Sequence, residues 1–220
     1  MRKRLGCLHA HYSNIAYIEQ TFFHINHIEL IHFVDPGLIL QASNGDSDSG
    51  LAFKVKEQLE WMENCQIDAI LITCTKYIAL IEGASIKLSI PILKIDEPFF
   101  EAICKDEQPQ TILFTNPGTV EGTMGRLQQY AIQHNKEIEV VAKVIDNTFE
   151  LIMQGKQEAY KKTILQALNH LKEAQRQISV AQLSMVEAAQ LFEKESGLTI
   201  THPLKSLVEF VIRSTELYSE

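Results

Sequence analysis

The sequence lacks any long apolar segment, and this absence argues against a membrane-spanning protein. No apolar run among the 220 residues approaches the roughly 18 that a membrane-spanning helix needs. The first apolar stretch, residues 5–10, is too short for the core of a secretion signal, and no small-residue cleavage site follows it. We therefore expect a cytoplasmic protein with no membrane partner.

Cysteine is scarce, and the cysteines present form no paired motif. Cys7, Cys65, Cys74 and Cys104 are widely spaced, with no CxxC among them. This spacing indicates a reducing compartment rather than a disulfide framework or a zinc-binding module. The histidines His9, His11, His24, His27 and His32 gather early in the chain, but they show no HExxH or similar ligand spacing. The sequence therefore predicts no metal site.

Positive charge is in the minority. The chain has 20 Lys and Arg against 28 Asp and Glu, which gives a formal net charge of −8. Its basic cluster is residues 2–4, which we interpret as a solvated terminus. Because contacts to phosphates need clustered Lys and Arg, we expect no nucleic-acid partner.

Glycine-rich phosphate loops are also missing. Gly118, Gly122 and Gly125 do not make GxGxxG, and no GxxxxGK occurs, so we expect no nucleotide and no other cofactor. Residues 46–50, DSDSG, resemble half of a calcium-binding loop, but the later Glu is missing and the Gly is misplaced. We expect a flexible loop and helix cap there.

The sequence does contain short β-branched runs that alternate with longer segments of helical spacing. The expected strands are residues 4–9, 29–35, 69–73, 91–96, 111–115, 137–145, 178–182 and 198–201. The expected helices are residues 12–24, 51–64, 119–135, a long helix ending near 174, 184–196 and a last helix from about 203. This order is typical of βαβ units and parallel sheets. It predicts an α/β fold with two pseudo-symmetric lobes, each a four-stranded, mostly parallel sheet flanked by helices.

The series of strands and helices occurs twice, which sets the expected domain boundaries. We expect residues 1–105 together with 203–220 to form the first lobe, and residues 106–202 to form the second. The last helix has an apolar side, Leu207, Val208, Phe210 and Val211, and we expect it to pack on the first lobe.

Ligands of open parallel sheets bind at the carboxyl ends of the strands. The residues that follow the expected strands are rich in hydroxyl and amide groups, which suit a small anion. The predicted substrate-binding residues are His11, Ser13, Asn14, Thr75, Thr115, Asn116, Thr119, Gln182, Ser184 and His202.

Cys74 is the candidate catalytic residue. It ends a buried strand where a helix begins, and a thiol at a helix N-terminus has a lowered pKa. The alternative interpretation is a small buried hydrophobic side chain. Cys7, Cys65 and Cys104 lie within a strand or on or after helices, and we expect packing roles for them.

Several segments, taken in order, carry a family resemblance. They are residues 8–10 leading to 13–14, HFVDPGL at 32–38, DAILITCT at 68–75, NPGTV at 116–120 and VAQLSM at 180–185. With these segments the chain resembles the aspartate/glutamate/hydantoin racemase superfamily over nearly its whole length. The resemblance implies two pseudo-symmetric lobes with a substrate site between them, and a homodimer.

The resemblance also implies a chemistry with two cysteines, one at the tip of the third strand of each lobe. One thiolate takes the α-proton, and the other thiol returns a proton to the opposite face of the carbon. Cys74 matches the first position, whereas the second falls on Gln182, which is neither an acid nor a base at neutral pH.

We therefore expect a racemase-like cytosolic enzyme that acts on a small carboxylate or dicarboxylate. Its single thiol acid/base would be Cys74, with isomerase- or decarboxylase-type chemistry. Two alternatives stay open. One is a ligand-binding or regulatory member of the same superfamily that has lost catalysis. The other is racemisation with His202 or His11 as a substitute acid.

Overall fold

The computed structural model describes residues 2–43, 48–82 and 86–217. By its internal contacts the chain divides into two compact units. The first is Met1–Glu97 together with Leu207–Glu220, and the second is Pro98–Ser206. The expected boundary after residue 105 therefore differs by one helix, α5 (Glu97–Lys105), because its Phe99, Phe100 and Ile103 are buried in the core of the second unit.

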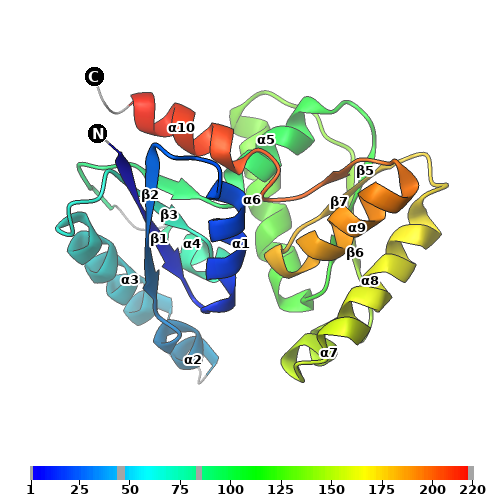
Figure 1. Ribbon diagram of the computed structural model, residues 1–220, viewed down its shortest axis with the longest axis horizontal. Coiled ribbons are helices and arrows are strands. Elements are labelled where there is room, and N and C mark those ends of the chain that lie inside the picture. Colours follow the sequence, from blue (N-terminus) through cyan, green and yellow to red (C-terminus); the bar gives the residue numbers. More distant parts are fainter. Residues whose placement is uncertain (1, 44–47, 83–85, 218–220) are drawn as a thin grey trace. The chain divides into compact units, whose positions relative to one another are not determined.

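The first unit is built on a four-stranded, all-parallel sheet with the strand order β2-β1-β3-β4 (Figure 1). Its strands are β1 (Lys3–His9), β2 (Ile28–Val34), β3 (Ala69–Ile72) and β4 (Ile92–Lys94). Its helices are α1 (Ser13–Phe22), α2 (Gly37–Ser43), α3 (Asp48–Glu63), α4 (Thr75–Ile81) and α10 (Leu207–Leu217). Helix α10 contacts α1, so the C-terminal segment lies with the first unit.

Strand β1 directs alternate side chains to opposite faces of this sheet, as its two-residue period requires. Gly6 lies under α3, where a Cβ atom would stand 2.5 Å from Ile67 Cδ1 and 3.4 Å from Met62 Cε. Only glycine therefore lets these side chains pack so closely on the strand. Cys7 and His9 point to the other face, which α1 covers.

The second unit has a sheet of the same kind, with the order β6-β5-β7-β8 and all pairs parallel. Its strands are β5 (Gln110–Phe114), β6 (Val140–Val144), β7 (Gln177–Val180) and β8 (Ile200–Thr201). Its helices are α5, α6 (Val120–Gln133), α7 (Thr148–Met153), α8 (Gln157–Leu171) and α9 (Val186–Ser196), with short 3₁₀ turns at Pro117–Thr119 and Leu183–Met185. The expected α/β fold with two four-stranded parallel sheets is thus confirmed.

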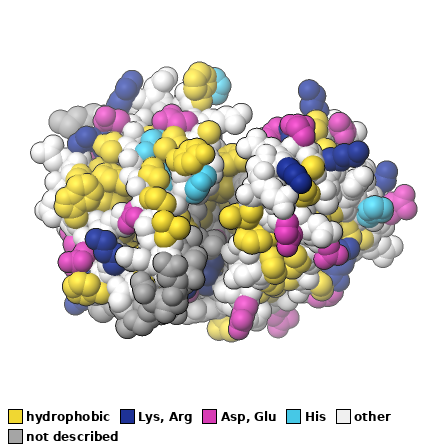
Figure 2. Space-filling view, turned by 90° about the horizontal axis from the view of Figure 1, so that it is seen from below, with side chains coloured by type: hydrophobic (Ala, Val, Ile, Leu, Met, Phe, Trp, Pro, Cys, Tyr) yellow, Lys and Arg dark blue, Asp and Glu magenta, His cyan; other side chains and the backbone are white. Residues whose placement is uncertain are grey.

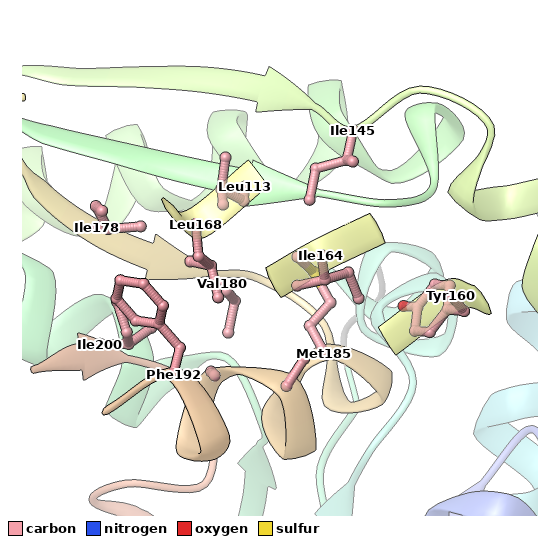
Figure 3. Packing of buried hydrophobic residues seen from close by; sticks show 12 residues of the cluster. Leu113, Ile145, Tyr160, Ile164, Leu168, Ile178, Val180, Met185, Phe192 and Ile200 are labelled. Carbon is pink, nitrogen blue, oxygen red and sulfur yellow. The ribbon is translucent and has the colours of Figure 1, made fainter. Parts of the chain in front are cut away.

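Helices cover both faces of the second sheet, and the alternation along β5 separates the two cores. Leu113 packs with residues of α8 and α9, among them Ile164 and Phe192 (Figure 3). Ile112 and Phe114 pack on the opposite face against α5 and α6. A sheet covered on both faces explains why its strands read as continuous apolar runs in the sequence.

The two sheets repeat one register. Leu8 of β1 lies opposite Ile72 of β3, and Leu113 of β5 lies opposite Val180 of β7. In each unit the residue after the third strand donates its backbone N–H to this leucine carbonyl, at 3.0 Å in both cases. Positions in one unit can therefore be matched to positions in the other, residue by residue.

Three expectations about local structure need correction. The long helix expected to end near residue 174 is two helices, because Gly155 adopts a left-handed conformation (φ +69°) between α7 and α8. Helix α2 was not expected, since its seven residues are too few to show a clear period. Of the loop expected at 46–50, residues 46 and 47 lie outside the described residues, and residues 48–50 begin α3.

Charges of both signs are interspersed on the face of the molecule seen in Figure 2, where dark-blue basic and magenta acidic side chains alternate. Among the described residues, no helix combines the length and the apolar character that crossing a membrane requires.

Candidate functional site

Cys74 lies two residues past the end of β3, at the N-cap position of α4. The strand before it is fully buried, whereas Cys74 itself is half-buried, so the chain brings the thiol from the core to the edge of the sheet. Thr75 is also half-buried and begins α4. This is the carboxyl end of the parallel sheet, where the sequence analysis expected the site.

A chain of polar side chains lies next to Cys74. The Thr73 hydroxyl donates to the Leu8 carbonyl oxygen at 3.1 Å and accepts from Asn14 Nδ2 at 3.4 Å. The same hydroxyl lies 2.8 Å from Nδ1 of His9, which is fully buried. Burial, and to a lesser degree nearby His32, lowers the pKa of His9 to about 4. Asn14 is thus held beside the strand tip that carries Cys74.

His11 and Ser13 form a separate, exposed pair. His11 Nδ1 lies 2.8 Å from the Ser13 hydroxyl and accepts the Ser13 backbone N–H at 3.2 Å. Both residues lie at the start of α1, and both face solvent. The pair therefore lies at the junction of β1 and α1, next to Asn14 in the chain.

A hydrogen bond from Tyr77 connects α4 to the residue that follows β2. Its hydroxyl donates to the backbone carbonyl of Asp35 at 2.6 Å. Burial raises the pKa of Tyr77, and negative charge at Asp35 and Cys74 raises it further. The phenol therefore stays protonated and positions the backbone around the thiol.

Gln182 is the counterpart of Cys74 in the second unit. It lies two residues past the end of β7 with an extended backbone (φ −121°, ψ 144°), close to that of Cys74 (φ −115°, ψ 120°). Its Oε1 accepts both the backbone N–H and the hydroxyl of Thr115, each at 2.7 Å, and its Nε2 donates to Thr119 Oγ1 at 3.1 Å. The side chain at the position equivalent to Cys74 is therefore a fixed, neutral amide.

Tyr160 extends this network from α8. Its hydroxyl lies 3.0 Å from Thr115 Oγ1 and 2.7 Å from Ser184 Oγ. The phenol thus connects two of the predicted substrate-binding residues, and it is itself almost fully buried. The apolar ring belongs to the core that Figure 3 shows, while its oxygen reaches the polar edge.

The loop after β5 is closed by local hydrogen bonds. Asn116 Oδ1 accepts the Gly118 backbone N–H at 3.0 Å, and Thr119 Oγ1 donates to the Asn116 carbonyl at 2.8 Å. These contacts shape the turn that precedes α6 and bring Thr119 within reach of Gln182. The NPGT segment therefore has a structural role in the same network.

His202 lies apart from this network. It follows β8 and is 6% exposed. Burial lowers its pKa to about 4, while Glu193 raises it and Lys205 lowers it by smaller amounts. A buried imidazole that resists protonation is a poor proton donor at neutral pH. This observation argues against His202 as the substitute acid.

A hollow of about 640 Å³ opens at the carboxyl ends of β5 and β6. It is lined by Thr115, Pro117, Val144, Ile145, Asp146, Asn147, Phe149 and Glu150. Asp146 and Glu150 are both exposed there, and two carboxylates disfavour an anionic ligand. We therefore do not assign the carboxylate site to this hollow.

The structure also gathers three side chains able to bind a metal. The ligand atoms of Cys7, His9 and His32 lie within 4.8 Å of one another. The two histidines show no ligand spacing along the chain, because strand pairing and not sequence separation brings the group together.

Apart from His202, the predicted site residues fall into two groups. His11, Ser13, Asn14, Cys74 and Thr75 lie at the strand ends of the first unit. Thr115, Asn116, Thr119, Gln182 and Ser184 lie at those of the second, and hydrogen bonds join all five through Tyr160 and the loop. Sequence reasoning missed Thr73 and Tyr160, since nothing in the sequence marks a threonine or a mid-helix tyrosine as a bridge.

Several solved structures that share this fold are described as racemases. An aspartate racemase of Picrophilus torridus is 15% identical, with 97% of this chain and 94% of that chain covered and a TM-score of 0.73. An allantoin racemase of Klebsiella pneumoniae is 17% identical, with 98% and 88% covered and a TM-score of 0.69. A glutamate racemase of Bacillus anthracis is 12% identical, with 99% and 83% covered and a TM-score of 0.69.

At these identities the likeness establishes the fold, and the resemblance seen in the sequence is confirmed at that level. Neither protein-family models nor curated protein sequences gave a match.

Proposed function

We propose that this chain is a cofactor-independent enzyme of the aspartate/glutamate racemase type that acts beside a carboxylate group, with Cys74 as its single thiol acid/base. Two observations support the proposal. The fold is shared with aspartate, allantoin and glutamate racemases, and Cys74 stands half-buried at the carboxyl end of the first sheet.

The observation that carries the proposal is the asymmetry between the equivalent positions 74 and 182. One holds a thiol, and the other holds an amide fixed by three hydrogen bonds. An amide neither takes nor gives a proton at neutral pH. Proton transfer in this chain is therefore one-sided.

In the proposed reaction the Cys74 thiolate takes the proton from the carbon next to the carboxylate. The C–H electron pair moves into the carboxylate and forms an enediolate, which hydrogen-bond donors stabilise. The candidate donors are Asn14, which is hydrogen-bonded to Thr73, and Thr75, which follows Cys74 in the chain. The same thiol then returns a proton to the same face, so the carbon exchanges hydrogen without inversion.

With a geminal dicarboxylate the same site would support decarboxylation. The carbon–carbon bond breaks, carbon dioxide leaves, and its electron pair forms the same enediolate. The Cys74 thiol protonates the carbon on one face, and the resulting thiolate takes a proton from water. We propose a small carboxylate or dicarboxylate as the substrate, held by the hydroxyl and amide groups at the strand ends.

The test is hydrogen exchange in deuterated water, followed by proton NMR, with a panel of small amino acids, hydroxy acids and geminal dicarboxylates. We expect exchange or decarboxylation that falls by a factor of about 10² to 10⁴ in Cys74→Ser. Cys65→Ser is the matched control, since Cys65 is also half-buried. An activity that Cys74→Ser leaves unchanged would contradict the proposal.

A second function is favoured by the fixed state of Gln182. A protein with a hydrogen-bonded amide where the resemblance implies a second thiol is equipped to hold a ligand without turning it over. In that case a carboxylate from the panel raises the unfolding temperature, while no member of the panel exchanges hydrogen or loses carbon dioxide.

A further inference from the structure

We propose that Cys7, His9 and His32 form a binding site for a transition-metal ion of the Zn²⁺ class. Their Sγ and ring nitrogen atoms all lie within 4.8 Å of one another. Thiolate and imidazole are the ligands that Zn²⁺ prefers in proteins. The cluster contains neither Cys74 nor the donors proposed for its reaction, although Thr73 connects His9 with Asn14.

Strand geometry creates the cluster. Cys7 and His9 are two residues apart on β1, so they point to the same face of the sheet. Cys7 lies directly opposite His32 on the neighbouring strand β2. All three side chains therefore converge beneath α1, whose Glu19 reaches the same place. Because the sheet fixes all three Cα positions, the cluster is preorganised.

The hydrogen bonds around His9 show which of its nitrogens is free to accept. The hydroxyl of Thr73 has one proton, which it donates to the Leu8 carbonyl oxygen. It must therefore accept from His9 Nδ1, which lies 2.8 Å away. His9 then carries its proton on Nδ1, and the lone pair of Nε2 points at His32.

The hydrogen bonds of His32 show which of its own nitrogens faces His9. His32 Nδ1 lies 2.8 Å from His9 Nε2, and His32 Nε2 lies 3.0 Å from Glu19 Oε1. The carboxylate requires a proton on Nε2, so Nδ1 of a neutral His32 also presents a lone pair to His9. Two facing lone pairs need a cation between them: either a second proton on His32 or a metal ion.

The arrangement around the nitrogens matches that of metal sites. A metal-bound histidine usually donates its other N–H to a carboxylate or hydroxyl, which fixes the ring. Glu19 does this for His32 and Thr73 does it for His9. One Cys7 thiolate and the Glu19 carboxylate would balance the charge of a divalent ion.

Only small movements of the three side chains are needed to reach the ligand spacing of a tetrahedral zinc site. Two nitrogens on one tetrahedral Zn²⁺ stand about 3.3 Å apart, given Zn–N bonds of about 2.0 Å, so the rings must separate by about half an ångström. The sulfur must approach by roughly 1 Å. Three protein donors leave a fourth coordination position, which water can occupy.

The second unit shows that the fold itself does not need polar groups here. By the repeated register, the positions of Cys7, His9 and His32 correspond to Ile112, Phe114 and Ala142. Those three pack in the apolar core against α5 and α6. A thiol and two imidazoles thus stand where the equivalent sheet uses hydrocarbon, at a cost in desolvation that metal binding would offset.

The test uses the full chain after dialysis against a chelator. We expect about one equivalent of Co²⁺ to bind, with the visible bands of a tetrahedral site and a near-ultraviolet thiolate-to-cobalt band. Cys7→Ala should lose the thiolate band, and Cys74→Ser should keep it. A thiolate band that disappears in Cys74→Ser and persists in Cys7→Ala would overturn the proposal.

Affinity for Zn²⁺, measured against a chromophoric chelator, gives a second test that does not depend on a fully buried position. His32→Gln and Glu19→Gln should each weaken binding by about 10- to 100-fold, because one removes a ligand and the other its orienting partner. His27→Gln, an exposed histidine, should have no effect. Wild-type affinity in both His32→Gln and Glu19→Gln would refute the site.

Discussion

Gln182 holds Thr115 through one oxygen atom, since its Oε1 accepts both the backbone N–H and the side-chain hydroxyl of Thr115 at 2.7 Å. The equivalent of Thr115 in the first unit is Ala10, two residues past the matching leucine, and alanine has no hydroxyl. The tip that carries Cys74 therefore lacks this hydroxyl clamp. The two units therefore differ at this strand end: one carries a thiol, and the other carries a rigidly held amide.

Replacing Gln182 by cysteine should lower the free energy of unfolding and introduce inversion of configuration. Gln182→Cys leaves the Thr115 N–H and hydroxyl without their acceptor, which should cost about 1–3 kcal/mol of unfolding free energy. If the proposed function holds, a second thiol at this position should also introduce inversion of configuration that the native chain lacks. Urea unfolding and chiral chromatography measure the two effects.

Gln182→Ala is the control for that experiment, because it removes the same hydrogen bonds and adds no thiol. It should be destabilised by a similar amount and should show no inversion. Robust racemisation by the native chain would show that another group supplies the second proton.

Tyr160→Phe should destabilise the second unit by about 1–2 kcal/mol. The substitution removes one oxygen that bridges Thr115 and Ser184 at a nearly buried position, while the ring keeps its place in the core. Tyr12→Phe is the matched control, since Tyr12 is 71% exposed. Equal unfolding free energies for the two variants would contradict a structural role of the phenol.

Cys74 should react with iodoacetamide at least about tenfold faster than Cys7 and Cys104. Burial raises the pKa of Cys7, and nearby Glu19 raises it further, so its thiolate is scarce. Burial likewise raises the pKa of Cys104. Peptide mapping at mildly alkaline pH measures the rates, and labelling of Cys104 with protection of Cys74 would count against the reactive thiol.

His202 should make the chain less stable in mild acid. Its pKa is about 4 in the folded state and 6.5 in a model peptide, so the unfolded chain binds the proton first as the pH falls. Stability should therefore decrease from about pH 6.5 down to about pH 4, by on the order of 2–3 kcal/mol, and this contribution should level off below.

Thermal unfolding between pH 7 and pH 4 tests the role of His202. His202→Gln should remove about half of the dependence, since buried His9 has a similarly lowered pKa of about 4. His27→Gln, an exposed histidine, should leave the dependence as in the wild type. If His202→Gln keeps the full acid sensitivity, the loss of stability comes from other groups.

Sequence reasoning succeeded where a local pattern decides the structure. Fully buried strands such as β3 and β5 read as apolar runs, and the place of Cys74 after β3 followed from the end of such a run. It failed at Gly155, because a single left-handed residue interrupts a helical pattern without changing its period. These successes and failures concern residues close together in the chain.

Contacts across strands could not be predicted in the same way. His9 and His32 meet because β1 and β2 pair in one register, and a shift of one residue would turn His32 to the opposite face. Tyr160 meets Ser184 because α8 packs beside α9. Such partners depend on how whole elements pack, which short motifs do not encode.

Because the two sheets repeat one register, β5 can serve as an internal reference for hydrogen exchange in β1. Residues 5–9 of β1 correspond to residues 110–114 of β5 along the two ladders, yet β5 has Phe114 where β1 has His9. A carboxylate or a metal ion that acts on the first sheet should slow amide hydrogen exchange in β1 relative to β5. Both strands are measured in the same sample, at the same temperature and in the same buffer. The ratio of their exchange rates therefore separates the effect of the ligand from any general change in the protein.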